Sequence, residues 1–377
     1  MNHFTFIAAA CFILFSSSRV NGQDIFEGYK HLFSRPLQYT GYQTQGQIRI
    51  DGKLSESSWE RAAWSESFVD IEGDLKPAPP FDTKFKMLWD SQYLYIAAEL
   101  AEPDIWATIK RRDEVVYYDN DFEIFIDPDG DTHNYFEIEV NAFNTIFDLF
   151  MPKPYRNGGP ALQTWDVPGL RSAVSVIGKI NKKGTDKKWM VEMAIPFSSL
   201  SLGNSVRGPR DLDVWRINFS RIEWDIETTG DGYQKKKDPF TNRPLPEHNW
   251  VWSPQGVVNM HYPERWGYLH FSTQKVGDPP IELSAPIAEE YKKYLWLLYY
   301  KQQEYRDRNR QFATQLSQLN FPALIDQPGI NCSILLEAGS SQFKAVLQST
   351  QTGERWQINQ DGKINKVSSR WSTKDNF

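Results

Sequence analysis

Polar side chains recur at every second position in three short apolar segments of the chain. In the segment 134–140, Glu137 and Glu139 alternate with apolar residues, and the segments 122–127 and 212–220 alternate in the same way. A strand places alternate side chains on opposite faces of its sheet, so each segment gains one apolar and one polar face. We expect the apolar faces to close a core and the polar faces to line a concave outer surface that hydrogen-bonds a ligand.

Two kinds of chemistry suit such a polar face. Glu123 and Glu139 would lie on neighbouring strands, and two carboxylates about 5–10 Å apart can act as the acid and base of a glycoside hydrolase. The same carboxylates, with the amides of Asn141 and Asn218, could instead hold the hydroxyl groups of a ligand. A face that is merely solvated is the third alternative.

A short acidic segment is the candidate metal site. Asp127, Asp129 and Asp131 alternate around Gly130. Hard cations such as calcium need several oxygen ligands at close range, which this spacing could supply. The segment resembles the first half of a calcium loop but lacks the distal glutamate. An acidic hairpin turn without a metal is the alternative.

The elements that must position these residues are mostly strands. Between about residues 45 and 272, short runs rich in Val, Ile, Phe, Tyr and Trp are separated by Gly, Pro, Asn and Asp. Helical periodicity is nearly absent from this part. Many antiparallel strands without intervening helices favour a sandwich or a barrel. The sequence therefore predicts a mainly β protein built on an antiparallel β-sandwich over 45–272.

The C-terminal part has a different pattern. A linker over 273–286 leads to a long amphipathic helix over 287–320, and short strands return over 331–370 as a small β extension. The apolar residues of the helix recur at spacings of three and four, as on one helical face. This stripe contains Tyr291, Tyr294, Leu295 and Leu298. We expect it to pack on the sandwich, and a helix-mediated dimer or a contact with a partner enzyme is the alternative.

The first residues have the pattern of a signal peptide. Residues 4–15 form an apolar run that is too short to span a bilayer, and small residues follow up to Gly22. We predict removal of residues 1–22 and an exported product, periplasmic or secreted. That product keeps one cysteine, Cys332, which cannot form an internal disulfide. No later segment is apolar and long enough for membrane insertion.

The charge balance narrows the classes of ligand. The 377 residues carry 42 Lys and Arg against 48 Asp and Glu, a formal net charge of −6. A mildly acidic protein lacks the positive field that attracts nucleic acids and anionic membranes, so we expect no nucleic-acid partner. The chain also contains 14 Trp, 17 Tyr and 23 Phe. These side chains must fill a large core or stack on flat ligands.

Four segments resemble, in the same order, the motifs of carbohydrate-binding module family 9. Residues 48–59 resemble its opening "I-DG-L-E--W" pattern, and 86–96 its "V-WD--YLY" strand pair. Residues 119–127 resemble its "D-VEIFID" strand, and 266–269 its closing strand. The resemblance implies a DOMON-like β-sandwich with structural calcium and no hydrolytic activity. It also implies sugar binding, often at the reducing end of a glucan or xylan chain, in support of polysaccharide breakdown.

The resemblance also assigns ligand-binding residues. The aromatic residue that precedes the third motif corresponds to Tyr117, with Tyr118 beside it, and the strand glutamate corresponds to Glu123. The family's amide corresponds to Asn141, and a polar residue of a later strand to Asn218. These types suit a pyranose, whose apolar faces are covered by aromatic rings and whose hydroxyl rim binds charged groups.

Two features depart from the family's pattern. Its arginine corresponds to Glu139, and neither tryptophan of its aromatic pair is present. The second tryptophan should lie just before the closing strand, where the chain has His261 and Tyr262. We expect one of these two residues, or the more distant Trp165 or Trp224, to replace it; otherwise the ligand differs.

Haem is the alternative ligand that the resemblance allows. Some DOMON-like domains hold haem between a methionine and a histidine or lysine, and Met87, Met260 and His261 are available. The chain has no c-type haem attachment motif. Sugar binding is therefore the first prediction. Haem binding and glycoside hydrolysis through Glu123 and Glu139 are the alternatives.

Overall fold

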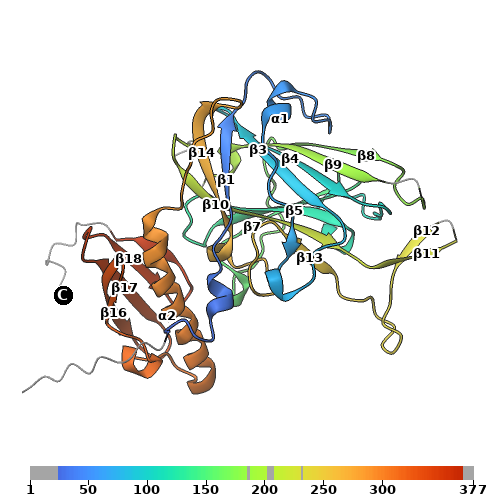
Figure 1. Ribbon diagram of the computed structural model, residues 1–377. Helices are drawn as coiled ribbons and strands as arrows, with labels where there is room; N and C mark the ends of the chain where they lie inside the picture. The colour runs from blue at the N-terminus through green and yellow to red at the C-terminus, as the bar shows by residue number, and fades with distance from the viewer. Residues whose placement is uncertain (1–23, 185–186, 202–207, 231, 368–377) are drawn as a thin grey trace, which may run out of the picture.

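The computed structural model describes residues 24–184, 187–201, 208–230 and 232–367. The predicted signal peptide, residues 1–22, lies outside the described residues. Figure 1 shows a β-sandwich and, beside it, a smaller C-terminal unit in which one long helix lies against a sheet. The fold is mainly β, as the sequence predicts.

The sandwich is one twelve-stranded sheet that folds back on itself, among the described residues. Its strand order is β7-β6-β5-β10-β14-β1-β3-β4-β9-β8, with β13 paired to β10 and β2 paired to β13. Neighbours run antiparallel, except that β1 runs parallel to both β14 and β3. The strands are β1 (Gln38–Gln43), β2 (Val69–Asp70), β3 (Thr83–Trp89), β4 (Tyr93–Ala101), β5 (Asp121–Asp127), β6 (Tyr135–Asn141), β7 (Ile146–Met151), β8 (Arg171–Ile177), β9 (Lys188–Pro196), β10 (Val214–Glu223), β13 (His248–Val251) and β14 (Gly267–Lys275).

Short elements connect these strands. A ribbon of two strands projects from the end of β10, and one-turn helices occupy several loops (Figure 1). They are α1 (Ser57–Arg61), the ribbon strands β11 (Ile226–Thr229) and β12 (Gly232–Lys235), and the 3₁₀ turns η1 (Lys30–Phe33), η2 (Gly73–Leu75), η3 (Val116–Tyr118), η4 (Tyr155–Asn157), η5 (Phe197–Ser199) and η6 (Pro263–Arg265).

The sandwich core confirms the alternation predicted from the sequence. The apolar sets of β5, β6 and β10 all point into one large core cluster between the two halves of the sheet. Its centre is aromatic, because the rings of Phe85 and Phe219 lie 3.9 Å apart and Trp252 contacts both. The polar sets of the same three strands therefore face outward. That placement fixes where a functional face can form.

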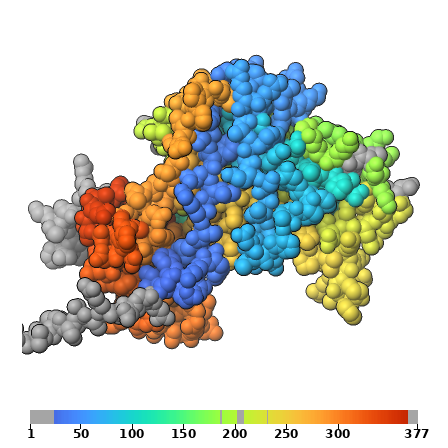
Figure 2. All heavy atoms as spheres, in the orientation of Figure 1, coloured from blue at the N-terminus to red at the C-terminus, as the bar shows by residue number. Residues whose placement is uncertain are grey.

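The C-terminal unit packs the helix α2 (Ile287–Asn309) on a five-stranded antiparallel sheet. Residues 295–300 are all buried, although they point in every direction around the helix axis. The sheet covers one side, and residues 25–33 near the N-terminus cover another, as the blue and orange surfaces in Figure 2 show. The strands are β15 (Leu324–Gln327), β16 (Ile330–Ala338), β17 (Phe343–Ser349), β18 (Arg355–Asn359) and β19 (Ile364–Lys366).

The helix differs in two ways from the prediction. Its apolar stripe packs mainly on its own small sheet rather than on the sandwich, so the stripe is not free to form a dimer. The helix also ends at Asn309, because Arg310 adopts a left-handed conformation and reverses the chain. Residues 316–319, inside the predicted helix 287–320, form the 3₁₀ turn η7 (Leu316–Leu319) instead. No helix in the described part of the chain is long and apolar enough to cross a membrane.

Buried ion pairs dock the C-terminal unit on the sandwich. Glu264 accepts hydrogen bonds from Arg156 at 2.8 Å and from the Tyr300 hydroxyl at 2.6 Å. Glu289 of α2 pairs with Arg216 of β10 at 2.5 Å. We call these pairs, with the tyrosines that contact them, the docking interface. Every carboxylate in it has a resident cation.

Candidate functional site

Four carboxylates lie together on the outward face of β5 and β6. They are Asp121, Glu123, Glu137 and Glu139, and we call them the acidic floor. Glu123 and Glu139 are directly opposite each other in the register of the two strands. Carboxylate oxygens of Asp121, Glu123 and Glu139 all lie within 4.8 Å of one another. The sheet thus gathers groups that are well separated in sequence.

The acidic floor is buried, whereas the sequence suggested an open concave face. Glu123 is 5% exposed, and none of the other three carboxylates is more exposed. Loops and turns fold over the face and place Ile71, Val116 and Met260 in an apolar layer with outward residues of the sheet. The alternation within the three strands could not predict this cover, because each covering residue comes from a different part of the chain.

Burial decides the electrostatics of the floor. It raises the pKa of Glu123 to about 8 and raises the pKa values of Asp121, Glu137 and Glu139 well above the usual range. No lysine or arginine among the described residues forms an ion pair with these four carboxylates. His261 lies near, with Nε2 3.9 Å from Glu137 Oε2. Burial, with the charge of Arg156, lowers the pKa of His261 to about 3, so this ring is neutral.

One edge of the floor is bordered by two tyrosines of the turn η3. The Tyr117 backbone N–H donates to Glu139 Oε2 at 3.0 Å, and the Tyr117 and Tyr118 rings lie 4.7 Å apart. Tyr117 is half-buried, while Tyr118 is 53% exposed. Both residues that the family resemblance assigns to the aromatic position therefore stand beside the predicted Glu139.

A third tyrosine borders the floor next to Glu137. Tyr155, in the turn η4, is 46% exposed, and its ring lies 4.4 Å from that of His261. Burial, followed by the charges of Glu137 and Glu139, raises the pKa of Tyr155 to about 12. The sequence analysis missed Tyr155 and did not select Glu137 as a site residue. An exposed aromatic residue in a Pro/Gly-rich turn directly after a strand was the signal for Tyr155.

A hollow of about 600 Å³ opens beside β13 and the end of β10. Its lining includes Trp224, Trp250, Glu247 and His248. Trp224 is fixed beside the tyrosine pair, because its indole N–H donates to the Tyr117 carbonyl at 2.9 Å. Of the two distant tryptophans considered from the sequence, Trp224 is therefore the one beside the floor.

The two predicted asparagines have structural contacts. The Asn218 amide donates to the Ser253 carbonyl at 2.8 Å and accepts from the Ser253 and Phe219 N–H groups at 3.0 Å. The Asn141 amide donates to the Ile109 carbonyl and to Asp119, and accepts two N–H groups of the following turn. Both side chains are fully buried and use their donors and acceptors within the chain.

The remaining predicted aromatic residues lie elsewhere. Tyr262 stacks on the Arg156 guanidinium at 4.0 Å and packs toward the C-terminal unit. Trp165 packs on Phe136, an inward residue of β6. Neither contacts a carboxylate of the acidic floor.

The structure separates the residues proposed for haem. Met87 lies in the sandwich core, whereas Met260 belongs to the apolar layer on the outer face. His261 Nδ1 is 2.9 Å from the Tyr135 hydroxyl, so this nitrogen already has a partner. Met87 therefore cannot pair with His261 across the sheet.

Two further acidic groups contrast with the floor. In the predicted calcium segment, oxygens of Asp127, Asp129 and Asp131 lie within 4.8 Å of one another, and Lys363 lies 3.0 Å from Asp131. Asp127 accepts backbone N–H groups of the same turn. These residues form a hairpin turn that could hold a cation and that also contacts the C-terminal unit.

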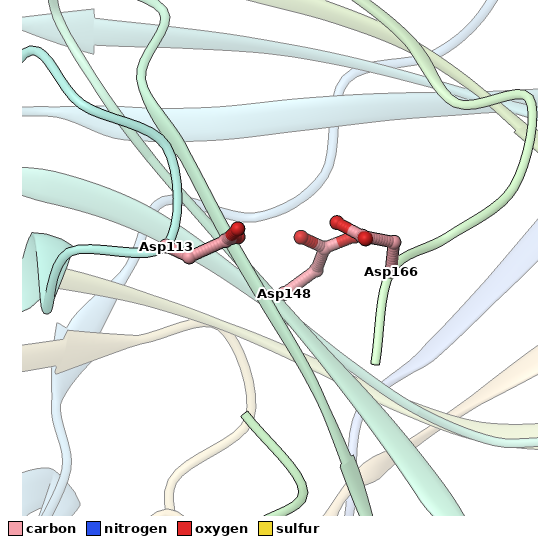
Figure 3. Close-up of side chains that lie close together, drawn as sticks. All are labelled: Asp113, Asp148 and Asp166. Atoms are coloured by element: carbon pink, nitrogen blue, oxygen red, sulfur yellow. The ribbon is translucent and has the colours of Figure 1, made fainter. Parts of the chain in front are cut away.

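The third acidic group was not predicted. Asp113, Asp148 and Asp166 converge from three segments, as Figure 3 shows. The Arg112 guanidinium lies 2.6 Å from Asp148 and 2.8 Å from Asp166. Arg112 therefore already supplies a positive charge to this group.

Comparison with known proteins identifies the family. The family described as "Carbohydrate family 9 binding domain-like" matches residues 50–241, about half of the chain. The chain belongs to this family. The resemblance seen in the four motifs is thereby confirmed. In this family 9 protein the third motif forms β5 and supplies Glu123, and the turn η3 directly before the motif supplies Tyr117.

Two curated relatives share part of the family 9 region. Exoglucanase XynX of Acetivibrio thermocellus is 28% identical over 130 residues, 34% of this chain and 10% of that protein. Endo-1,4-beta-xylanase A of Thermoanaerobacterium saccharolyticum is 26% identical over 130 residues, 34% of this chain and 9% of that protein. The chain therefore spans about a tenth of the length of these relatives.

Solved structures show more distant similarity. A proposed carbohydrate-binding protein from Bacteroides uniformis aligns with a TM-score of 0.46 and 16% identity, over 63% of this chain and all of that one. A family 9 module from Caldicellulosiruptor kristjanssonii in complex with cellotriose aligns with a TM-score of 0.40 and 16% identity, over 66% of this chain and all of that one. These similarities are too low to support an argument about the ligand.

Proposed function

We propose that this family 9 protein is an exported, non-catalytic carbohydrate-binding protein. Its ligand, a mono- or oligosaccharide, would lie over the acidic floor and contact Tyr118 and Tyr155. The observation that carries this proposal is the half-exposed ring of Tyr155 beside Glu137 and Glu139, together with the tyrosine pair of η3. In that pair the Tyr117 N–H donates to Glu139, and the exposed Tyr118 ring lies 4.7 Å from the Tyr117 ring. Export is supported by the signal-peptide pattern of residues 1–22.

The site has the chemistry that a sugar requires. Aromatic rings cover the apolar faces of a pyranose, and Tyr118 and Tyr155 present such rings to solvent. The hollow with Trp224 and Trp250 in its walls provides room for a further sugar unit. The named relatives are an exoglucanase and an endo-xylanase. We therefore favour glucan or xylan oligosaccharides, including their reducing ends, as ligands in polysaccharide breakdown.

Calorimetric titration tests the proposal. The mature chain is titrated with a panel of glucan and xylan oligosaccharides and with their reduced alditols. We expect binding that Tyr155→Ala and Tyr118→Ala weaken. Phe240→Ala is the matched control, because Phe240 is 94% exposed and lies in the loop after β12. Loss of binding on reduction of the end sugar would assign a reducing-end site. Silence across the panel would refute the proposal.

The floor geometry favours binding over hydrolysis. A glycosidase places its substrate between two carboxyl groups that reach it from different directions. Glu123 and Glu139 instead lie side by side on one sheet face and are buried. We expect no release of reducing sugar from the oligosaccharides that bind. Release that Glu123→Gln abolishes would favour the hydrolase.

Calcium at the turn of Asp127, Asp129 and Asp131 is a second part of the proposal. It is supported by the proximity of the three carboxylates. Asp129→Asn should then reduce the thermal stabilisation that calcium confers. An unchanged calcium effect would leave the turn as a hairpin held by its own hydrogen bonds and Lys363.

A partner contact through the C-terminal unit completes the proposal. Because the stripe of α2 is covered, the contact would use exposed apolar residues of the small sheet, Leu324 and Leu335. Size-exclusion chromatography with light scattering, alone and with a glycoside hydrolase, tests for a dimer or an enzyme complex.

A further inference from the structure

We infer that the acidic floor is a binding site for a hard divalent cation of the calcium type. The site consists of Asp121, Glu123 and Glu139, with Glu137 beside them. It is separate from the turn of Asp127 and is built on the sheet face itself. The inference does not depend on the identity of the sugar.

The spacing of the carboxylates fits one shared ion. Calcium takes 6–8 oxygen ligands at about 2.3–2.6 Å, so two ligands of the same ion lie at most about 5 Å apart. Oxygens of Asp121, Glu123 and Glu139 are within 4.8 Å of one another. One cation can therefore reach all three without a rearrangement of the strands.

Buried oxygen atoms without partners are an independent sign of a missing ligand. Asp121 Oδ2, Glu137 Oε2 and the Ser220 hydroxyl are buried, and none has a hydrogen-bond partner. Ser220 is directly opposite Glu123 in the register of β10 and β5, so its side chain shares the face of the floor. Buried polar atoms are nearly always satisfied in folded proteins. A cation at the floor would satisfy these atoms together.

The floor also has no cationic partner from the described part of the chain. The other two acidic groups have Arg112 and Lys363, but among the described residues no lysine or arginine pairs with the floor. Ionised carboxylates without a counter-charge are strongly disfavoured in a dry site. A bound cation would supply the counter-charge that these residues lack.

The donor atoms select the class of metal. Carboxylate and hydroxyl oxygens suit hard cations, whereas zinc and copper favour histidine and cysteine. Magnesium retains several waters in a strict octahedral arrangement, which suits a buried floor less well than the flexible coordination of calcium does. Calcium is therefore the expected ion, and magnesium is the competitor to test.

Calorimetric titration of the metal-free mature chain with calcium chloride alone tests the inference. Besides any calcium bound at the turn of Asp127, we expect a site whose affinity falls at least tenfold in Glu139→Gln and in Glu123→Gln. Asp129→Asn, at the turn, is the matched control and should leave this site intact. Magnesium should bind at least tenfold more weakly than calcium.

Three outcomes would overturn the inference: no calcium binding, binding unchanged in both glutamine variants, or binding lost only in Asp129→Asn. Circular dichroism of the metal-free variants excludes misfolding, because removal of an uncompensated carboxylate should leave them at least as thermostable as the parent. No sugar is present, so a failure of carbohydrate binding would leave this result unaffected.

Discussion

The acidic floor and the docking interface bury the same kinds of groups with opposite electrostatic results. Burial alone would raise the pKa of Glu289, yet Arg216 and Lys292 hold it at about 2. Burial raises the pKa of Glu123 on the floor to about 8. Both regions also contain tyrosines beside the carboxylates. They differ in one respect, which is the presence of resident cations.

The presence or absence of resident cations distinguishes the docking interface from the candidate site. In the docking interface the chain supplies every counter-charge, so the ion pairs hold two parts of the molecule together. In the acidic floor the chain supplies the negative groups only. Such a site is unfavourable in the isolated protein and becomes favourable when a ligand arrives. Unpaired burial at the floor therefore agrees with the proposal that an ion or ligand binds there.

The largest expected effect comes from breaking a docking pair. Glu264→Ala leaves the buried Arg156 unpaired and removes the partner of Tyr300, so the free energy of unfolding should fall by about 3–5 kcal/mol. Urea unfolding followed by tryptophan fluorescence measures this change. Glu137→Gln on the floor, in calcium-free buffer, is the contrast and should not destabilise. Equal losses in both variants would end the distinction between the regions.

The stability of the protein should depend on pH in the way that the buried carboxyl groups of the floor dictate. A carboxyl group whose pKa rises on folding stabilises the protein below its ordinary pKa near 4.5 and loses that contribution as pH rises to the folded value. For Glu123 this interval runs from 4.5 to about 8. Metal-free protein should therefore lose on the order of 3 kcal/mol of unfolding free energy across it.

Thermal melts in EDTA at pH 4.5–8 measure this loss. Glu123→Gln should flatten the profile, because the amide does not titrate. A melting temperature of the parent protein that rises from pH 4.5 to 8 would contradict the prediction that the floor carboxyl groups are buried without a counter-charge.

Exposed tyrosines should matter for the ligand and little for the fold. Tyr155→Ala removes a ring that is about half exposed, so sugar affinity should fall about tenfold, or about 1.4 kcal/mol, with little change in unfolding. Titration with the best oligosaccharide of the panel gives the affinity. A large drop in stability without a change in affinity would move Tyr155 from the site to the docking interface.

The smallest effect is expected at the solvent-exposed edge of the interface. Lys363 is 3.0 Å from Asp131 but is partly exposed, and such ion pairs contribute about 0–1 kcal/mol. Lys363→Ala should therefore barely change the urea midpoint, and the effect should shrink further in salt. A loss comparable with that of Glu264→Ala would mean that this pair is part of the buried network.

The sequence predicted the faces of the strands but not what covers them. Alternation in 122–127 and 134–140 is a local pattern, so it placed Glu123 and Glu139 on one outward face correctly. The apolar cover over that face comes from residues such as Ile71 and Met260, far away in the chain. These residues reach the face through tertiary packing, and the alternation of apolar and polar residues within a strand does not encode that packing.

The same limit applies to the aromatic residues and to the helix. Tyr117 could be predicted because it directly precedes a recognisable motif. Tyr155 lies in a turn whose Arg156 is held by the distant Glu264. The stripe of α2 was visible in the sequence. Its partner sheet was not, since a stripe specifies that a face is buried but does not specify against which surface.

The turn that carries Tyr155 is secured by a late part of the chain. Asn157 of that turn donates to the carbonyl of Asp361 and accepts from Tyr299, so its anchors follow it by well over a hundred residues. A ribosome adding about 5–20 residues per second needs roughly ten seconds or more to make that intervening stretch. During synthesis the sandwich can thus form before the edge that carries Tyr155 is fixed. The position of Tyr155 would then depend on a segment made long after the strands that surround it.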